Sequence, residues 1–431
     1  MRNGIAIIDV DRHVMEPMSL WPEYLPAKYR AFAPDVRPLA PPGETLGARL
    51  ARLGDHALFP TPAIVTVGGK PICHGMTEVG YIEVGLHAEG RRDEFVAAET
   101  AAGQLAAMDA WGVDLAVLLP TYAGFLVYDE DVDADRSRAY ASAYSRWLAD
   151  LCRERPARLK GAVLLSRHDP AHLVADLEAG LAAGHRAAVM RPNPVRGRTL
   201  GAPELEPFYA ACAASGVPLL LHEGAHTRVQ TAGASRFATH FAQHACSHPL
   251  EAMMALLALL EGGVLERHPS LRVGFLESGC GWLPYWLWRL DALGYAQSSN
   301  ELGDRMRRPP SAYFRRQCWI AFEPDEALLR PAVEAIGADR VVFGTDFPHV
   351  DHDAQIVGKL FGPDAPLDAA LLEAALWHNP ARLLGLDEPA DALRLRSADV
   401  RLTFERGPTP LKDAAARAAR PLRLLRSLRS P

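Results

Sequence analysis

Acidic and histidine side chains follow several short apolar runs of the sequence. The first run leads into Asp11 and His13, and later runs end at His222, Glu277 and Asp346. Residues two apart on an extended strand point to the same side, so Asp11 and His13 can project together. Imidazole nitrogen and carboxylate oxygen together suit divalent zinc, manganese, iron or cobalt, with no thiolate required. These residues are therefore candidates for binding a divalent metal ion.

Each candidate also has a structural interpretation. His222 could be an ordinary core or loop histidine, and Asp346 could cap a helix. Glu277 precedes a Ser-Gly pair and could form a turn. Arg191 ends another apolar run, where its fork could bind two oxygens of a carboxylate or phenolate, or form a structural salt bridge. Further histidines could line the same site, and the sequence assigns them no role: His226, His248, His349 and His352.

Short apolar runs alternate with longer helical patterns, which is typical of βαβ units and a parallel sheet. Most runs are continuously apolar, as expected for strands that are covered on both faces. Eight strands favour a closed (β/α)8 barrel, in which active sites lie at the C-terminal ends of the strands. The predicted strands are Ile5–Val10, Leu115–Pro120, Lys160–Leu165, Ala187–Arg191, Pro218–His222, Leu271–Glu277, Cys318–Phe322 and Arg340–Thr345.

Helical periodicity lies between these strands. Several of the predicted helices begin at a proline, which the first turn of a helix tolerates because no N–H is needed there. The predicted helices are Arg136–Cys152, Pro170–Ala183, Pro203–Ala214, Pro249–Arg267 and Asp368–Leu384.

Two segments depart from the alternating pattern. Residues 24–97 are too long for a simple connection between the first two strands, and we expect an insertion beside the barrel mouth. Residues 391–431 form a basic C-terminal extension with arginine at every third position near its end. This tail could be an amphipathic helix that touches a membrane, a partner or an anion, or a helix that packs on the barrel or frays. The expected organisation is a barrel over residues 1–390 followed by the tail.

Composition limits the classes of partner. The formal net charge of −6 is modest for 431 residues, so the charge of the protein does not favour nucleic acid as a binding partner. The six cysteines include no C-x-x-C pair, which argues against a zinc–cysteine site and a disulfide framework. No apolar stretch approaches the roughly 20 residues that span a bilayer, and no signal-peptide core follows the first residues. We expect a cytoplasmic protein that acts on a small molecule.

Three segments resemble the amidohydrolase-related family, in the branch that contains aminocarboxymuconate-semialdehyde and resorcylate decarboxylases. The segments are Ile8–Pro17, Phe275–Trp286 and Phe343–His349, and the resemblance extends from about residue 5 to about residue 386. It implies a (β/α)8 barrel with one divalent metal ion (Zn, Mn or Fe) and a homodimer. The metal ligands that it implies are Asp11, His13, His222 and Asp346.

The sequence departs from the family pattern at two positions. Asp11 stands where the family usually has histidine or glutamate, and Glu277 stands at the usual position of a catalytic histidine on the sixth strand. Aspartate is shorter and anionic, so it could bind the metal directly or through water. Glutamate changes the acid–base options unless burial raises its pKa. A barrel without catalytic activity is therefore one of the alternatives.

Two reactions fit the same residues. In metal-assisted hydrolysis of an amide, lactone or related bond, Asp346 would move the proton and Glu277 would assist. In non-oxidative decarboxylation of an aromatic or unsaturated acid, Asp346 would protonate the carbon that loses carbon dioxide. Because the sixth-strand histidine is missing, we expect hydrolysis, with decarboxylation as the alternative.

Overall fold

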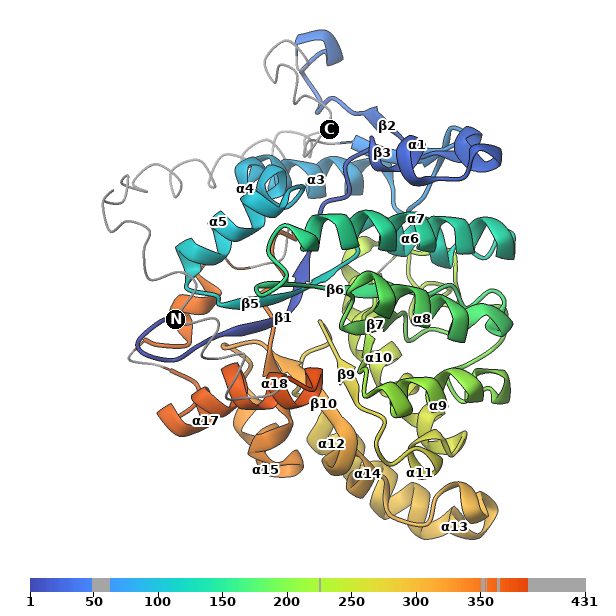
Figure 1. Cartoon of the computed structure of the whole chain (residues 1–431), viewed down its shortest axis with the longest axis vertical. Coiled ribbons are helices and arrows are strands. Elements are labelled where there is room, and N and C mark those ends of the chain that lie inside the picture. The colour runs from blue at the N-terminus through green and yellow to red at the C-terminus, as the bar shows by residue number, and fades with distance from the viewer. Residues whose placement is uncertain (49–62, 225, 350–352, 354, 363–364, 387–431) are drawn as a thin grey trace, which may run out of the picture. The chain divides into compact units, whose positions relative to one another are not determined.

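The computed structural model describes residues 1–48, 63–224, 226–349, 353, 355–362 and 365–386 (Figure 1). The predicted C-terminal extension at residues 391–431 and His352 lie outside the described residues. The division of the chain into a barrel and a tail thus stays a prediction.

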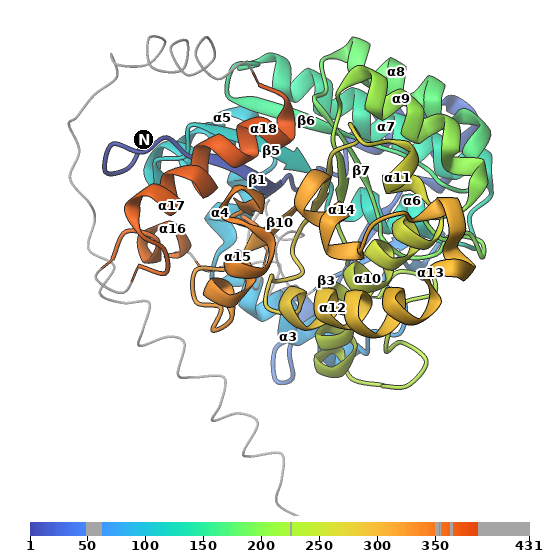
Figure 2. The ribbon, with the colours of Figure 1, turned by 90° about the horizontal axis from the view of Figure 1, so that it is seen from below.

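Eight parallel strands form one sheet that follows the order of the chain, β1-β5-β6-β7-β8-β9-β10-β11. The barrel predicted from the sequence is confirmed, and each predicted strand is present: Cys318–Phe322 has the predicted ends, and the others have ends shifted by a few residues. Helices surround these strands in the view from below (Figure 2). The strands are β1 (Ile8–His13), β5 (Leu115–Leu119), β6 (Leu159–Leu164), β7 (Ala187–Met190), β8 (Leu219–Leu221), β9 (Val273–Phe275), β10 (Cys318–Phe322) and β11 (Val341–Phe343).

The barrel closes where the chain leaving β11 meets β1. The backbone carbonyl of Asp11 accepts hydrogen bonds from the N–H groups of Thr345 and Asp346 at 3.1 and 2.8 Å. Gly344 permits this approach, since a Cβ at its position would lie 2.3 Å from the Cβ of Asp11. The side chain of Asp9 fixes the same junction by accepting from the N–H and hydroxyl of Thr345 at 2.9 and 2.6 Å. The first and last strand ends are therefore held together.

The connections are helical. Three helices follow the predicted segments closely: α7 (Ala134–Arg153), α8 (Leu173–Ala183) and α9 (Glu206–Ser215). The segment predicted as one helix over Asp368–Leu384 contains α17 (Ala369–Glu373), a π-helical turn at Ala374–His378 and α18 (Asn379–Leu384). Within the part of the chain that the structure describes, no helix is both long and apolar enough to cross a bilayer.

The predicted start of the helix at Pro249 is wrong. Helix α10 spans His240–Glu261, and Pro249 lies inside it. The helix begins earlier because the Thr239 hydroxyl caps it, accepting from the N–H of Ala242 at 3.3 Å. The first two turns of α10 consequently become part of the barrel mouth.

The insertion between β1 and β5 has its own secondary structure. Strands β2 (Asp35–Pro38), β3 (Ala63–Val67) and β4 (Lys70–Pro71) form a three-stranded antiparallel sheet. Helices α3 (Glu78–Glu89), α4 (Arg92–Ala97) and α5 (Ala101–Trp111) follow it. A buried apolar cluster of Met15, Phe95, Ala98 and Phe347 packs the end of the insertion against the segments after β1 and β11. The insertion is thereby fixed beside the strand ends.

Candidate metal centre

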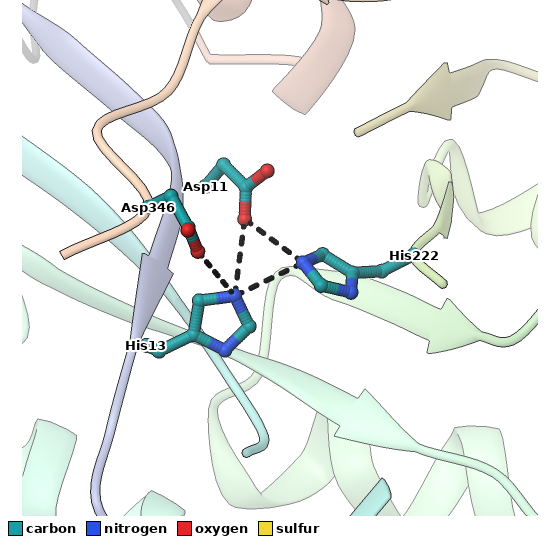
Figure 3. Close-up of side chains that lie close together, drawn as sticks. All are labelled: Asp11, His13, His222 and Asp346. Atoms are coloured by element: carbon teal, nitrogen blue, oxygen red, sulfur yellow. Dashed lines mark hydrogen bonds and ion pairs between the residues drawn. The ribbon is translucent and has the colours of Figure 1, made fainter. Parts of the chain in front are cut away.

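Four of the predicted site residues meet at the C-terminal ends of the strands (Figure 3). Asp11 and His13 lie on β1, His222 directly follows β8, and Asp346 follows β11. One ligand atom from each of the four lies within 4.8 Å of all the others. The sequence analysis therefore identified residues that the fold brings together.

The two histidines direct the same ring nitrogen into the cluster. The Nδ1 of His13 lies 2.9 Å from the carbonyl oxygen of Pro120, which can accept a hydrogen bond from Nδ1–H and so leave Nε2 with the lone pair that binds a metal. The Nε2 atoms of His13 and His222 are 3.0 Å apart. Two imidazole nitrogens that face one another at this distance suit a shared cation.

The surroundings of the Asp11 carboxylate show whether a metal ion fits this arrangement. Its Oδ1 is buried and has no hydrogen-bond partner among the described residues. The same atom lies 3.4 Å from the Nε2 of both His13 and His222. Burial raises the pKa of Asp11, but the two neighbouring imidazoles outweigh this effect and hold it well below its usual range. An ionised, buried oxygen beside two ring nitrogens fits one divalent cation.

The fourth ligand candidate completes the ring of oxygen and nitrogen atoms. The Oδ1 of Asp346 lies 3.3 Å from the Nε2 of His13. Asp346 has a positive backbone φ of 50°, and Glu277 after β9 has a φ of 43°. Left-handed backbone is rare for residues with a side chain and is often found at functional sites. Both carboxylates are thus aimed by unusual backbone conformations at the ends of their strands.

Glu277 lies beside the cluster, against His222. Its Oε2 is 2.9 Å from the Nε2 of His222, and its Oε1 is 3.5 Å from the Nε2 of His248 on α10. Burial lowers the pKa of His222, whereas Asp11 and Glu277 raise it, to about 10. The surplus of carboxylates makes the site attractive to cations.

Several histidines without a predicted role lie at the site in the structure. His349 lies with its Nδ1 2.7 Å from the Oδ1 of Asp346 and its ring stacked on His13 at a centroid distance of 3.8 Å. Its Nε2 is 3.0 Å from the Thr121 hydroxyl. Helix α10 adds His240, His244 and His248, which line the same pocket. The spacing of four residues between these histidines, after a capping threonine, was the available sequence signal.

A pocket of about 900 Å³ opens over the cluster. Arg191 lines it, and burial leaves this side chain only 6% exposed. Its Nη1 donates to the carbonyl oxygen of Gly224 at 2.5 Å and lies 3.5 Å from the Oε1 of Glu223, while its Nε has no hydrogen-bond partner among the described residues. Arg191 therefore forms the structural ion pair and also retains a donor. Much of the remaining wall is apolar or aromatic: Met15, Val65, Met76, Phe95, Tyr122, Phe125 and Tyr128.

Comparison with known proteins places this site in a family. A family model described as amidohydrolase matches residues 8–386. The 2-amino-3-carboxymuconate-6-semialdehyde decarboxylase of Dictyostelium discoideum is 25% identical over 193 residues, which are 45% of this chain and 52% of that protein. The chain thus matches about half the length of that relative. Gamma-resorcylate decarboxylase of Polaromonas sp. is 25% identical over 245 residues, which are 52% of this chain and 70% of that protein.

A solved structure shares the fold. The 5-carboxyvanillate decarboxylase of Novosphingobium aromaticivorans, solved with bound manganese, superposes with a TM-score of 0.63 at 19% identity, covering 89% of this chain and 98% of that one. Both relatives are named as decarboxylases. Decarboxylation is the alternative reaction of the sequence analysis, whereas hydrolysis is the expected one. The expected homodimer stays a prediction. On the match over residues 8–386, the chain belongs to the amidohydrolase family and is an enzyme of that superfamily.

Proposed function

We propose that this enzyme decarboxylates an aromatic or unsaturated acid without oxidation, with one divalent metal ion held by Asp11, His13, His222 and Asp346. The observation that carries the proposal is the position of this cluster beneath an aromatic-lined pocket that also contains Arg191. The names of the relatives support the same reaction. The manganese in the 5-carboxyvanillate decarboxylase supports manganese as the first ion to test.

The pocket suits a planar acid. Tyr122, Phe125 and Tyr128 offer ring surfaces for an apolar body, and the guanidinium of Arg191 offers a donor for an oxygen. A bound divalent ion would supply positive charge for the oxygens of the substrate.

Asp346 is the proton donor in this proposal. Its carboxyl group gives a proton to the carbon that bears the carboxylate. The bond to the carboxylate then breaks, its electron pair returns to the substrate carbon, and carbon dioxide leaves. His349 touches Asp346 at 2.7 Å and lines the pocket, so it can return a proton to Asp346 for the next turnover.

Hydrolysis is the second candidate because of Glu277. A carboxylate 2.9 Å from His222 and on the pocket wall could accept a proton from an attacking water. The strand-end carboxylates would then act as base and acid on an amide or ester.

Release of carbon dioxide tests the proposal. The manganese-loaded enzyme is incubated with a panel of hydroxybenzoates and unsaturated dicarboxylic acids, beside the Asp346→Asn variant. Asp304→Asn is the matched control, since that side chain is 92% exposed. We expect carbon dioxide from at least one acid with the wild type and the control, and none above background with Asp346→Asn. Equal release by all three proteins would contradict the proposal.

A further inference from the structure

Helix α10 presents a row of histidines to the pocket. His240, His244 and His248 follow one another at intervals of four residues, so they share one helix face. The ring centroids of His240 and His244 are 5.4 Å apart, and those of His244 and His248 are 4.6 Å apart. All three line the pocket above the metal cluster. The row therefore reaches the site from an element that contributes none of its four ligand candidates.

The C-terminal end of this row of histidines lies against Glu277. One ligand atom from each of His244, His248 and Glu277 lies within 4.8 Å of the other two. Two histidines one helical turn apart, completed by a carboxylate, are a recurrent arrangement for zinc and similar ions. The residues thus have the types and spacing of a metal site of their own.

The orientation of His248 supports this arrangement. Its Nδ1 lies 2.9 Å from the Ser247 hydroxyl, and its Nε2 lies 3.5 Å from the Oε1 of Glu277. A partner on one ring nitrogen fixes the imidazole and leaves the other nitrogen for a metal. His248 is also buried, at 7% exposure, so its ring is held by packing.

Glu277 connects the two groups of residues through its two oxygens. Oε2 faces His222 of the first cluster at 2.9 Å, and Oε1 faces His248 at 3.5 Å. The Glu277 side chain is only 15% exposed, so water screens its charge weakly and a cation bound against Oε1 would gain from it.

We propose that His244, His248 and Glu277 bind a second divalent transition-metal ion, and that the Glu277 carboxylate is shared between the two metal sites. The inference does not depend on which reaction the enzyme catalyses. Paired ions can hold two oxygens of one substrate, or a substrate and a water, on either side of a reacting bond.

Metal stoichiometry tests this proposal directly. The full chain is stripped with a chelator, titrated with zinc or manganese against a competing chelator, and its metal content is measured by mass spectrometry. We expect two tightly bound ions per chain in the wild type. The second ion should bind at least about 10- to 100-fold more weakly in His244→Ala and in His248→Ala, because losing even the partner of a ligand costs that much. His240→Ala, one turn earlier on the same helix, is the matched control and should retain two.

Three results of the metal titration would overturn the proposal. They are one ion per chain in the wild type at saturation, two equally tight ions in the His244→Ala/His248→Ala double variant, or an equal loss in His240→Ala, which would indicate loose binding along the whole row. His248→Gln keeps a polar side chain in the buried position and replaces His248→Ala if that variant does not fold. Electron paramagnetic resonance of the manganese-loaded protein adds an independent readout. A shared carboxylate predicts spin coupling in the wild type that Glu277→Gln weakens, and uncoupled manganese in both proteins would contradict it.

Discussion

The Oε2 of Glu277 lies 2.9 Å from the Nε2 of His222, so a carboxylate from the end of β9 touches an imidazole from the end of β8. The resemblance to the family leads one to expect a histidine at the position of Glu277. The exchange adds a negative charge to the site, and His248 from α10 lies against the opposite oxygen at 3.5 Å. An imidazole is therefore present near this position, but a helix supplies it.

Asp11→Asn should weaken binding of the first metal ion. The amide keeps the size of the side chain but removes the charge of a buried oxygen that faces two imidazoles at 3.4 Å. We expect the dissociation constant for manganese, measured against a competing chelator, to rise by at least about 10- to 100-fold. Asp304→Asn, on the surface, should bind as the wild type does. An unchanged dissociation constant in Asp11→Asn would remove this residue from the ligand set.

His349→Phe should slow turnover without removing metal. Phenylalanine preserves the ring that stacks on His13 but lacks the nitrogen that lies 2.7 Å from Asp346. Because positioned acid–base groups contribute roughly 100- to 10,000-fold, we expect kcat to fall by about 10- to 100-fold for a group that acts through Asp346. Metal content measured on the same sample serves as the control. A normal kcat would exclude His349 from proton transfer.

Arg191→Lys separates substrate binding from the structural ion pair. Lysine keeps the charge beside Glu223 but loses the planar fork and the buried Nε. We expect KM for an acid substrate to rise about tenfold, which corresponds to about 1.4 kcal/mol, with a smaller change in kcat. Glu223→Gln is the comparison, since it breaks the same pair while retaining the guanidinium. If both variants lower Tm and neither changes KM, Arg191 is structural only.

The raised pKa of Glu16 should make the stability of the protein depend on pH. The buried carboxyl group of Glu16 accepts hydrogen bonds from the N–H groups of Thr121, Tyr122 and Ala123 at 2.9–3.1 Å. Burial raises its pKa from 4.5 to about 7, although these donors oppose the rise. The folded protein thus binds a proton more tightly than the unfolded chain does. The stability from this group is complete below pH 4.5 and declines as pH rises through about 7.

The Glu16→Gln variant tests this prediction, because a glutamine side chain at this position cannot titrate. We expect the variant to be less stable overall, because an amide offers one acceptor atom where the carboxylate offers two. Its free energy of unfolding should vary less between pH 5 and 7 than that of the wild type, by about 2 kcal/mol. Urea denaturation at both pH values measures the difference. Parallel pH dependences in the two proteins would show that Glu16 has an ordinary pKa.

Much of the barrel could be predicted because its strands are buried on both faces and appear as continuous apolar runs. The residues at the predicted strand ends then indicate Asp11, His13, His222 and Asp346 as a group, since parallel strands bring their C-terminal ends to one edge. The contacts of Arg191 agree with both interpretations of this residue, the ion pair and the available donor.

The boundaries of α10 could not be predicted from proline placement alone. The sequence pattern predicts Pro249 in the first turn of a helix, but this helix tolerates a single missing N–H in its interior and begins after its cap, Thr239. A helix that starts at Pro249 therefore leaves His240 and His244 without a predicted place in the site. The approach of His248 to Glu277 depends on tertiary packing between α10 and the end of β9, which no local pattern encodes.

Isotope labelling of the product tests the proposed reaction most directly. The metal-loaded enzyme converts an acid substrate in water enriched in deuterium and in the heavy oxygen isotope, and the products are analysed by mass spectrometry. Decarboxylation predicts carbon dioxide and an organic product with one solvent deuterium on the carbon that lost the carboxylate, and no heavy oxygen in that product. Heavy oxygen in the organic product, without release of carbon dioxide, would contradict the proposal and identify a hydrolase.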